Sequence, residues 1–308
     1  MGNSNYPQGF PFGVTVRGMP LLSAYPGKVF WVDSNTGANG GQGTFDRPFD
    51  TIDYAVGRCT ASRGDIIMVK AGHVETVTAA GGLDLDVAGI AIIGMGTGSL
   101  RPTINFTTVV GADMDIDAAN ITMSNFLFTG GIDALTGPID INAADCTLMN
   151  IETRDVTGQA TDFIVTDANA SRLLISGWKH LGAAAAGADT AISLVGGDDW
   201  VIEAFDIYGN FAVAAIENVT TAANRVRIGG GPVPNLIWTE NAADACITMV
   251  AASTGYIGPN LFLMLQDNAA NFAGATVGAA MQFMKPIQIV NLAGESSGDT
   301  TITASTNA

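Results

Sequence analysis

The sequence predicts an all-β protein whose chain winds into a parallel β-helix, a solenoid in which successive coils stack on one another. Three observations predict it. A short apolar pattern recurs every 25 to 31 residues through the middle of the chain, 38 of the 308 residues are glycine, and only 14% are charged. Repeats of this length bury their apolar side chains only by stacking on neighbouring repeats. An antiparallel meander is the competing interpretation, but few hairpin dipeptides separate the apolar runs.

Each copy of the pattern is a corner residue, an apolar–x–apolar stretch, and then Asn or Gly at the sixth position. Alternation with period two indicates one face of a β-strand, so the alternate side chains should point inward. The copies begin at Gly89, Asn120, Asp145, Arg172, Asp199, Arg225 and Gly255. The predicted inward side chains are Ile121, Met123, Leu148, Leu173, Ile175, Ile202, Val226 and Ile228.

A second strand of the same kind lies between the copies, so each repeat holds at least two strands. These strands are expected at 114–116, 139–141, 163–165, 191–194 and 247–249. The sixth position of each copy predicts a corner with positive φ, which Gly and Asn adopt most easily. Six of the seven copies carry Gly or Asn there, and Ala204 is the exception. Asn125 and Asn150 are one repeat apart, so their amides are expected to stack.

The first coil needs a cover, because an open coil exposes unpaired backbone groups. Asp50 and Thr51 are suited to N-cap a helix. The apolar residues Ile52, Ala55, Val56 and Cys59 that follow have helical spacing. The turn at 64–65 then leads into an apolar strand over 66–69.

Three segments at this end of the chain resemble the first coils of pectate-lyase-like right-handed β-helix proteins, which bacteriophage virion surface proteins and tailspikes often contain. The segments are 29–33 (VFWVD), 47–56 (RPFDTIDYAV) and 64–77 (GDIIMVKAGHVETV). Residues 6–13 (YPQGFPFG) also resemble the amino end of phage-encoded proteins of similar size. The resemblance implies a single-stranded right-handed parallel β-helix and a phage setting. It does not identify an activity, because the same fold carries enzymes, adhesins and inert proteins.

The chain divides into four expected segments. An extended N-terminal arm over 1–28 precedes a first strand and capping helix over 29–65. The coils of the β-helix occupy 66–261, and a C-terminal cap and mobile tail occupy 262–308. The arm alternates Gly and Pro with aromatic residues and leucines, which favours a segment that lies on a surface, either its own β-helix or a neighbouring subunit.

Composition excludes several kinds of partner. With 13 Lys and Arg against 29 Asp and Glu, the formal net charge is −16, so nucleic acid is not expected as a partner. The apolar runs are too short and too rich in Gly for a membrane span, and the first residues lack the pattern of a Sec signal peptide. Three isolated cysteines, Cys59, Cys146 and Cys246, are expected to be core thiols.

One group of acids is a candidate site. Asp113, Asp115 and Asp117 alternate on one strand, and Asp140 follows Asp115 by one repeat. Neighbouring coils are ~4.8 Å apart, which suits either a catalytic carboxylate pair or a calcium site. A solvated outer face is the simpler interpretation, because any two acids one coil apart achieve this spacing. We therefore predict no catalytic residue, no metal ligand and no cofactor.

The other polar residues of interest are expected to be structural. Asp84, Asp86, Asp198 and Asp199 fit corners, and the two histidines, His73 and His180, lie far apart without a nucleophile motif. Arg225 and Arg227 alternate on an outward face. They are expected to bind an acidic group, most often in a salt bridge between subunits.

These observations predict a structural protein rather than an enzyme. The corners are short, and the aromatic residues are scattered instead of forming the floor of a glycan groove. The resemblance adds the setting: a capsid decoration or cement protein on a virion, made in the host cytoplasm. It is expected to be a homotrimer whose N-terminal arm contacts the major capsid protein, with a host surface glycan as a further partner. The alternatives are a tail-associated receptor-binding spike and a polysaccharide depolymerase.

Overall fold

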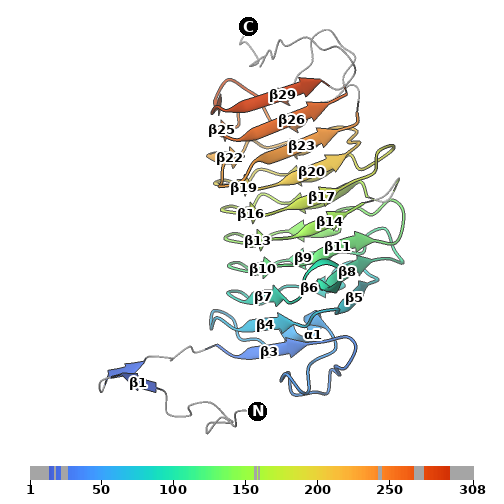
Figure 1. The fold of residues 1–308 in the computed structure, drawn as a ribbon, viewed down its shortest axis with the longest axis vertical. Helices are drawn as coiled ribbons and strands as arrows, with labels where there is room; N and C mark the ends of the chain where they lie inside the picture. Colours follow the sequence, from blue (N-terminus) through green and yellow to red (C-terminus); the bar gives the residue numbers. More distant parts are fainter. Residues whose placement is uncertain are drawn as a thin grey trace.

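A computed structural model of the chain describes residues 14–16, 19–21, 27–155, 158, 160–241, 245–266 and 274–291. In this part of the chain three long parallel sheets form a β-solenoid of about eight turns with almost no helix (Figure 1). The predicted fold class is therefore confirmed, and the solenoid is of the right-handed type. In the described residues no helix has the length and apolar character needed to cross a membrane.

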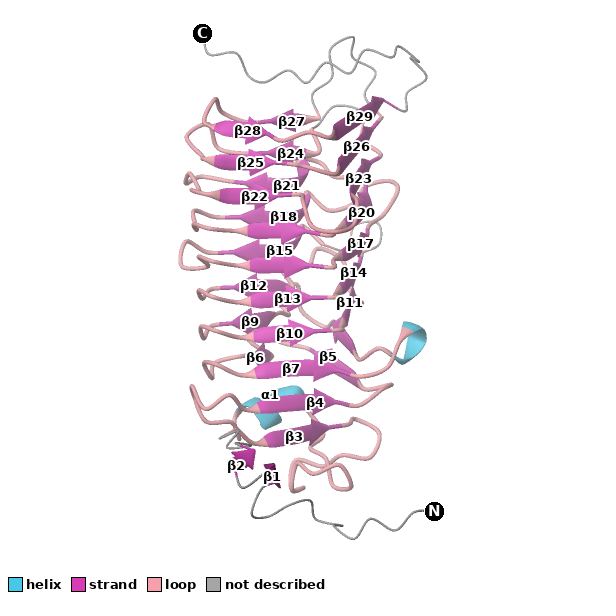
Figure 2. Ribbon diagram, turned by 60° about the vertical axis from the view of Figure 1, so that its left-hand side comes forward, coloured by secondary structure: helices cyan, strands magenta, loops and turns pink. Residues whose placement is uncertain are grey.

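Each complete coil contributes one strand to each of three sheets, which we call sheets 1, 2 and 3 (Figure 2). Sheet 1 contains β3 (Val29–Val32), β4 (Ile66–Val69), β7 (Ala91–Gly94), β10 (Thr122–Ser124), β13 (Thr147–Met149), β16 (Leu174–Ser176), β19 (Val201–Glu203), β22 (Val226–Ile228), β25 (Gly255–Ile257) and β28 (Met281–Phe283). Sheet 2 contains β5 (Val74–Val77), β8 (Thr103–Phe106), β11 (Leu127–Gly130), β14 (Glu152–Arg154), β17 (Lys179–Leu181), β20 (Asp206–Gly209), β23 (Asn235–Thr239), β26 (Leu261–Leu265) and β29 (Ile287–Asn291). Sheet 3 contains β6 (Leu83–Asp84), β9 (Met114–Ile116), β12 (Ile139–Ile141), β15 (Asp162–Thr166), β18 (Thr190–Leu194), β21 (Ala214–Asn218), β24 (Ile247–Thr248) and β27 (Ala275–Thr276).

The core is a set of stacked rows of inward side chains. In sheet 1 the register places Leu148 beside Ile175 and Ile175 beside Ile202. All eight side chains predicted to point inward are at most 1% exposed. Period-two alternation at a fixed repeat position therefore identified the core rows of this sheet correctly.

Sheet 2 was not among the predicted strands. Its strands follow those of sheet 1 after a turn of two residues in the middle coils, so each of these coils holds three strands where at least two were predicted. The inward row of this sheet also contains the polar residues Thr153 and His180 in register. Their presence interrupts the apolar pattern that would have revealed the third strand.

Corners with positive φ occur at both ends of the recurring pattern. The sixth position is left-handed in six copies, including the predicted exception Ala204 at φ 56°, whereas Gly94 is not left-handed. The first position is left-handed in all seven copies, even where it is Arg172 or Arg225. The amide of Asn125 donates to the carbonyls of Gly94 and Gly96, which fastens its corner to the preceding coil.

Helix α1 (Ile52–Val56) lies at the first coil and contacts β3, β4 and β6. Thr51 is its N-cap, and the side chain of Thr51 accepts a hydrogen bond from the backbone N–H of Tyr54. Ile52 and Val56 are buried, as their spacing predicts. The helix is shorter than the apolar spacing suggests: it ends at Val56, with Gly57 as its C-cap, before Cys59.

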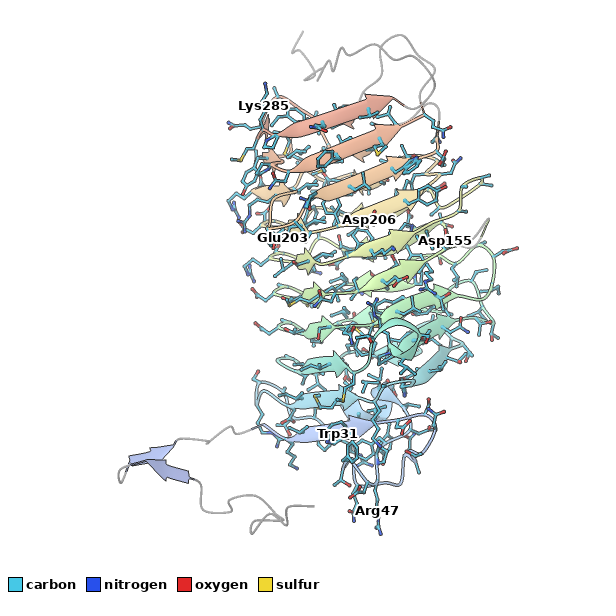
Figure 3. All side chains as sticks on the ribbon, in the orientation of Figure 1. Trp31, Arg47, Asp155, Glu203, Asp206 and Lys285 are labelled. Atoms are coloured by element: carbon cyan, nitrogen blue, oxygen red, sulfur yellow. The ribbon has the colours of Figure 1, made fainter. Side chains whose placement is uncertain are left out.

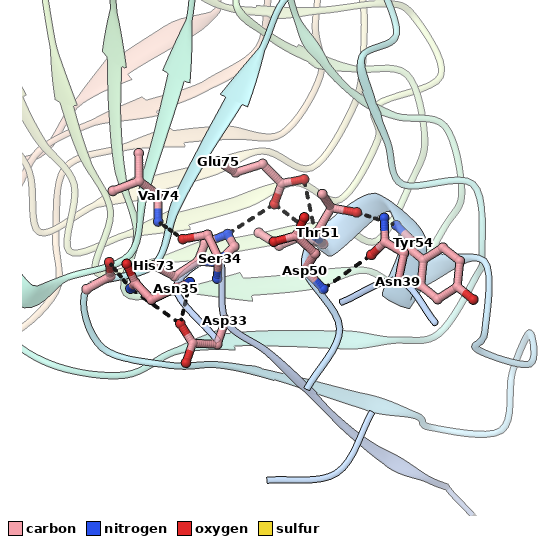
Figure 4. A network of polar contacts seen from close by, with 12 residues as sticks. Asp33, Ser34, Asn35, Asn39, Asp50, Thr51, Tyr54, His73, Val74 and Glu75 are labelled. Atoms are coloured by element: carbon pink, nitrogen blue, oxygen red, sulfur yellow. Dashed lines mark hydrogen bonds and ion pairs between the residues drawn. The ribbon is translucent and has the colours of Figure 1, made fainter. Parts of the chain in front are cut away.

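A buried polar network holds α1 against the first coil (Figure 4). The carboxylate of Glu75 accepts the backbone N–H of Ile52 at 2.8 Å, where it also meets the positive end of the helix. His73 lies between Ser34 and Glu75: its Nδ1 accepts the backbone N–H of Ser34 at 2.9 Å, and its Nε2 is 3.2 Å from Glu75 Oε2. Nε2 therefore carries the proton, and both ring nitrogens serve the structure.

Both ends of the chain contain residues outside the described part. Of the expected arm over 1–28, the structure describes the antiparallel pair β1 (Val14–Val16) and β2 (Met19–Leu21), and residues 27–28. The expected mobile tail beyond residue 291 lies outside the described residues. The expected end of the coils at residue 261 is too early, because β27, β28 and β29 continue the three sheets to Asn291.

Candidate functional site

Three aspartates form a row on the outer face of sheet 3. Asp84 on β6 pairs in register with Asp115 on β9, and Asp115 pairs with Asp140 on β12. The neighbours of Asp115 and Asp140 along their strands are buried, so the carboxylates project from the opposite side. The sequence prediction that Asp115 and Asp140 lie one coil apart is confirmed, and Asp84 extends the row by a further coil.

Other acids surround this row. Asp113 Oδ1 accepts the backbone N–H of Gly81 at 2.5 Å. Asp117 Oδ1 accepts a hydrogen bond from Asn142 Nδ2 at 3.0 Å. The described residues offer no ion-pair partner to Asp84, Asp113, Asp115, Asp117 or Asp140. The candidate site therefore concentrates negative charge without a basic residue beside it.

This crowding changes how the row titrates. Burial, followed by the charges of Asp113 and Asp140, raises the pKa of Asp115 to about 6. Burial also raises the pKa values of Asp84 and Asp140, and neighbouring carboxylates add to the effect at both residues. Oδ1 of Asp84 is buried without a hydrogen-bond partner. The members of the row cannot all ionise easily, so Asp115 keeps its proton to a higher pH than an isolated aspartate does.

The geometry of this row suits acid–base chemistry. The strands that carry Asp115 and Asp140 are ~4.8 Å apart, which is close to the separation of about 5 to 5.5 Å between the two carboxyl groups of retaining glycosidases. In such a pair one carboxyl stays protonated to act as an acid, and the other is ionised. Among the described residues no three His, Cys, Asp or Glu side chains are placed to share one metal ion.

The remaining candidate residues lie elsewhere and have structural surroundings. Asp199 occupies a left-handed corner, as expected. Arg225 pairs within its own chain, with Nε 2.6 Å from Asp199 Oδ1, and the expected salt bridge between subunits stays a prediction. Arg172 pairs in the same way with Asp145 of the preceding corner, at 2.6 Å. These corner residues stack in the order Asp145, Arg172, Asp199 and Arg225, so opposite charges alternate from coil to coil.

His180 and two of the cysteines are buried. His180 is enclosed by Phe163, Trp178 and Phe211, its Nδ1 is 2.8 Å from Thr153 Oγ1, and burial lowers its pKa to about 3. Cys146 and Cys246 are 0% exposed, and Cys59 is half-buried against the core. Burial raises the pKa of Cys59 and of Cys246 to about 12, which keeps both thiols protonated and unreactive.

An aromatic pair on the outer face of sheet 2 was missed at the sequence level. Tyr208 on β20 and Trp238 on β23 are in register, and their ring centroids are 5.6 Å apart at an interplanar angle of 87°. Tyr208 also hydrogen-bonds Glu240 through its hydroxyl at 3.2 Å. The two residues are separated by 30 positions in the sequence, so only the repeat length would have indicated that they meet.

No protein-family model and no curated protein sequence matches the chain. Among solved structures, a rhamnogalacturonan lyase is 13% identical with a TM-score of 0.39, over 87% of this chain and 86% of that one. A GH136 lacto-N-biosidase from Eubacterium ramulus is 12% identical with a TM-score of 0.38, over 86% of this chain and 68% of that one. Similarity at this level concerns the fold alone.

The comparison corrects one prediction, that the chain is not an enzyme. The solved proteins to which its architecture is similar are named as a lyase and a lacto-N-biosidase, so this architecture is not a reason to exclude catalysis. The prediction rested on short corners and on scattered aromatic residues. Tyr208 and Trp238 are not scattered in the folded chain, and the acidic row needs no long loop to bring its members together. The activity of the chain must therefore be inferred from the residues of the site and not from the fold.

Proposed function

We propose that this protein binds and cleaves a polysaccharide along the outer face of sheet 3. Asp115 acts as the general acid that protonates the leaving glycosidic oxygen, and Asp140 attacks the anomeric carbon to form a glycosyl ester as the glycosidic bond breaks. Water, deprotonated by the Asp115 carboxylate, then hydrolyses this ester and restores both carboxyl groups. The observation that carries the proposal is the in-register row of Asp84, Asp115 and Asp140, in which the pKa of Asp115 is raised to about 6.

The surroundings assign these roles. A general acid must be protonated at the working pH, and the negative charges on both sides of Asp115 keep its proton in place. Asp140 lies one coil further, at the separation that suits a nucleophile beneath the sugar ring. The outer face of a solenoid is long and straight, so an extended polymer can lie along it, across several coils.

The proposal corresponds to the alternative of a polysaccharide depolymerase rather than to capsid decoration. The homotrimer, the contact of the arm with a major capsid protein and the location on a virion stay predictions. A depolymerase of this kind is compatible with a receptor-binding spike, since binding a surface glycan precedes its cleavage.

The test is a screen of bacterial and plant polysaccharides for newly formed reducing ends, with the wild-type protein and Asp115→Asn. We expect cleavage of at least one polysaccharide, and we expect the variant to lose about 100-fold or more of that activity. Asp206→Asn is the matched control, because Asp206 is an exposed aspartate on β20 of sheet 2 (Figure 3). A folded Asp115→Asn protein with wild-type activity, or a blank screen, contradicts the proposal.

A further inference from the structure

A concave site lies on the outer face of sheet 1, near the C-terminal end of the solenoid. It is a cavity of about 390 Å³, open to solvent, and it is lined by both polar and apolar side chains. Its size is within the range of small-ligand pockets. The lining residues that matter here are Asp199, Arg225, Arg227, Tyr256, Gln282 and Met284.

The repeat places three of these side chains in one outward row. Arg227 on β22 pairs in register with Tyr256 on β25, and Tyr256 pairs with Gln282 on β28. Successive members are therefore ~4.8 Å apart at the backbone. A cationic, an aromatic and an amide side chain thus follow one another on three neighbouring coils.

The two arginines of the cavity differ in their partners. Arg225 is held by Asp199 through two hydrogen bonds of 2.6 and 2.7 Å and by Asp198 at 3.4 Å, so its position is fixed. Arg227 is exposed and makes no ion pair with any described residue. The cavity therefore offers one exposed guanidinium without an ion-pair partner among the described residues, on a protein whose formal net charge is −16.

We propose that this cavity binds an acidic sugar, such as a uronate unit of a polysaccharide. The guanidinium of Arg227 would bind the sugar carboxylate in a charge-assisted pair. The ring of Tyr256 would pack against the apolar face of the sugar, and the amide of Gln282 would hydrogen-bond its hydroxyl groups. Met284 provides an apolar wall.

This inference goes beyond the cleavage site, because the cavity is on sheet 1 and the acidic row is on sheet 3. An acidic polymer would be repelled by most of the surface of this protein. An exposed arginine without an ion-pair partner gives such a polymer a defined place of attachment. The inference thus names acidic polysaccharides as ligands, while binding at Arg227 and cleavage at Asp115 can fail independently.

Isothermal titration calorimetry with trigalacturonate tests the site. Maltotriose is the neutral control of equal length, and acetate is the control for a bare carboxylate. We expect trigalacturonate to bind about tenfold or more tightly than either control, and Arg227→Gln to remove about tenfold of that affinity. Binding should also weaken as salt is added, because the cavity is open to solvent.

Lys179→Gln is the matched variant: Lys179 is exposed on β17 of sheet 2, and its loss changes the net charge by the same amount. This variant should bind trigalacturonate within about twofold of the wild type. The proposal is overturned if trigalacturonate does not bind at about 10 mM, if acetate binds as well as trigalacturonate, or if Arg227→Gln and Lys179→Gln bind alike. Polysaccharide cleavage by Arg227→Gln is measured alongside, and its retention leaves the function of Asp115 intact.

Discussion

Single residues in this fold have neighbours that their position in the sequence does not reveal. Asp115 is an ordinary strand residue until the coils stack, and then it has Asp84 on one side and Asp140 on the other. Burial and these charges oppose its ionisation in the folded state. In the unfolded chain the same carboxyl titrates near its usual pKa of about 3.9.

This difference makes the stability of the protein depend on pH. Because the folded-state pKa of Asp115 is raised to about 6, its contribution is most favourable below the unfolded pKa and is lost as the pH rises from about 4 through 6. Asp115→Asn should therefore raise the melting temperature at pH 7, and the gain should shrink as the pH approaches 4. Thermal unfolding at the two pH values checks this. If Asp115→Asn changes the melting temperature equally at both pH values, or lowers it at pH 7, folding does not oppose the ionisation of the Asp115 carboxyl.

The register of the acids could be predicted from the repeat length, and Asp115 and Asp140 were paired correctly in that way. Asp84 was assigned to a corner together with Asp86, whereas in the structure Asp84 lies on β6 in register with Asp115. The pairing of Arg225 with Asp199 was also missed. Both residues occupy the first position of neighbouring copies, and stacking of corners was considered only for the sixth position.

At the scale of the coil, the corners determine where each strand ends. The sixth position of the pattern is left-handed even at Ala204, where the residue type gives no sign of it. The stacking of neighbouring coils therefore imposes the corner, and the preference of the residue is secondary. The same holds at Arg172 and Arg225, whose left-handed backbones are accompanied by ion pairs to the preceding corners.

A pair of substitutions measures the strain at Ala204. The left-handed conformation costs an L-residue about 1 to 2 kcal/mol, and glycine avoids this cost. Glycine also raises the conformational entropy of the unfolded chain, which cancels part of the gain in stability. Ala204→Gly should therefore stabilise the protein slightly, by about 0.5 kcal/mol, in chemical denaturation. Ala204→Val should destabilise it by about 1 kcal/mol or more, because β-branched residues tolerate positive φ poorly.

The control is Ala91→Gly on β7, where the backbone is an ordinary strand. There the same chemical change should cost about 0.5 to 1 kcal/mol. Destabilisation by Ala204→Gly as large as that by Ala91→Gly would mean that the corner at 204 holds no strain.

At the scale of the whole molecule, stacking converts a weak sequence pattern into three continuous sheets. The repeat and its inward rows were predictable because sheet 1 has an unbroken apolar alternation. The strands of sheet 2 could not be predicted in this way, because Thr153 and His180 replace apolar residues in the inward row of this sheet. Function was harder still to predict, because residues such as Tyr208 and Trp238 meet only after the coils have stacked.

The two proposed sites lie on different faces of the solenoid. Sheet 3 carries the acidic row, and sheet 1 carries the cavity with Arg227. A long polymer can contact both surfaces of one solenoid only if it wraps around it or if two molecules share it. The two sites therefore predict separate effects of substitution, with cleavage depending on Asp115 and affinity depending on Arg227.

The central claim is that two carboxylates one coil apart cleave a glycosidic bond by a double displacement. The most direct test is proton NMR of the first product formed from a cleaved polysaccharide, because the anomeric signal reports the stereochemistry. The separation of Asp115 and Asp140 predicts that the anomeric configuration of the substrate is retained. An inverted product or an unsaturated sugar end, which marks a lyase, would contradict the account.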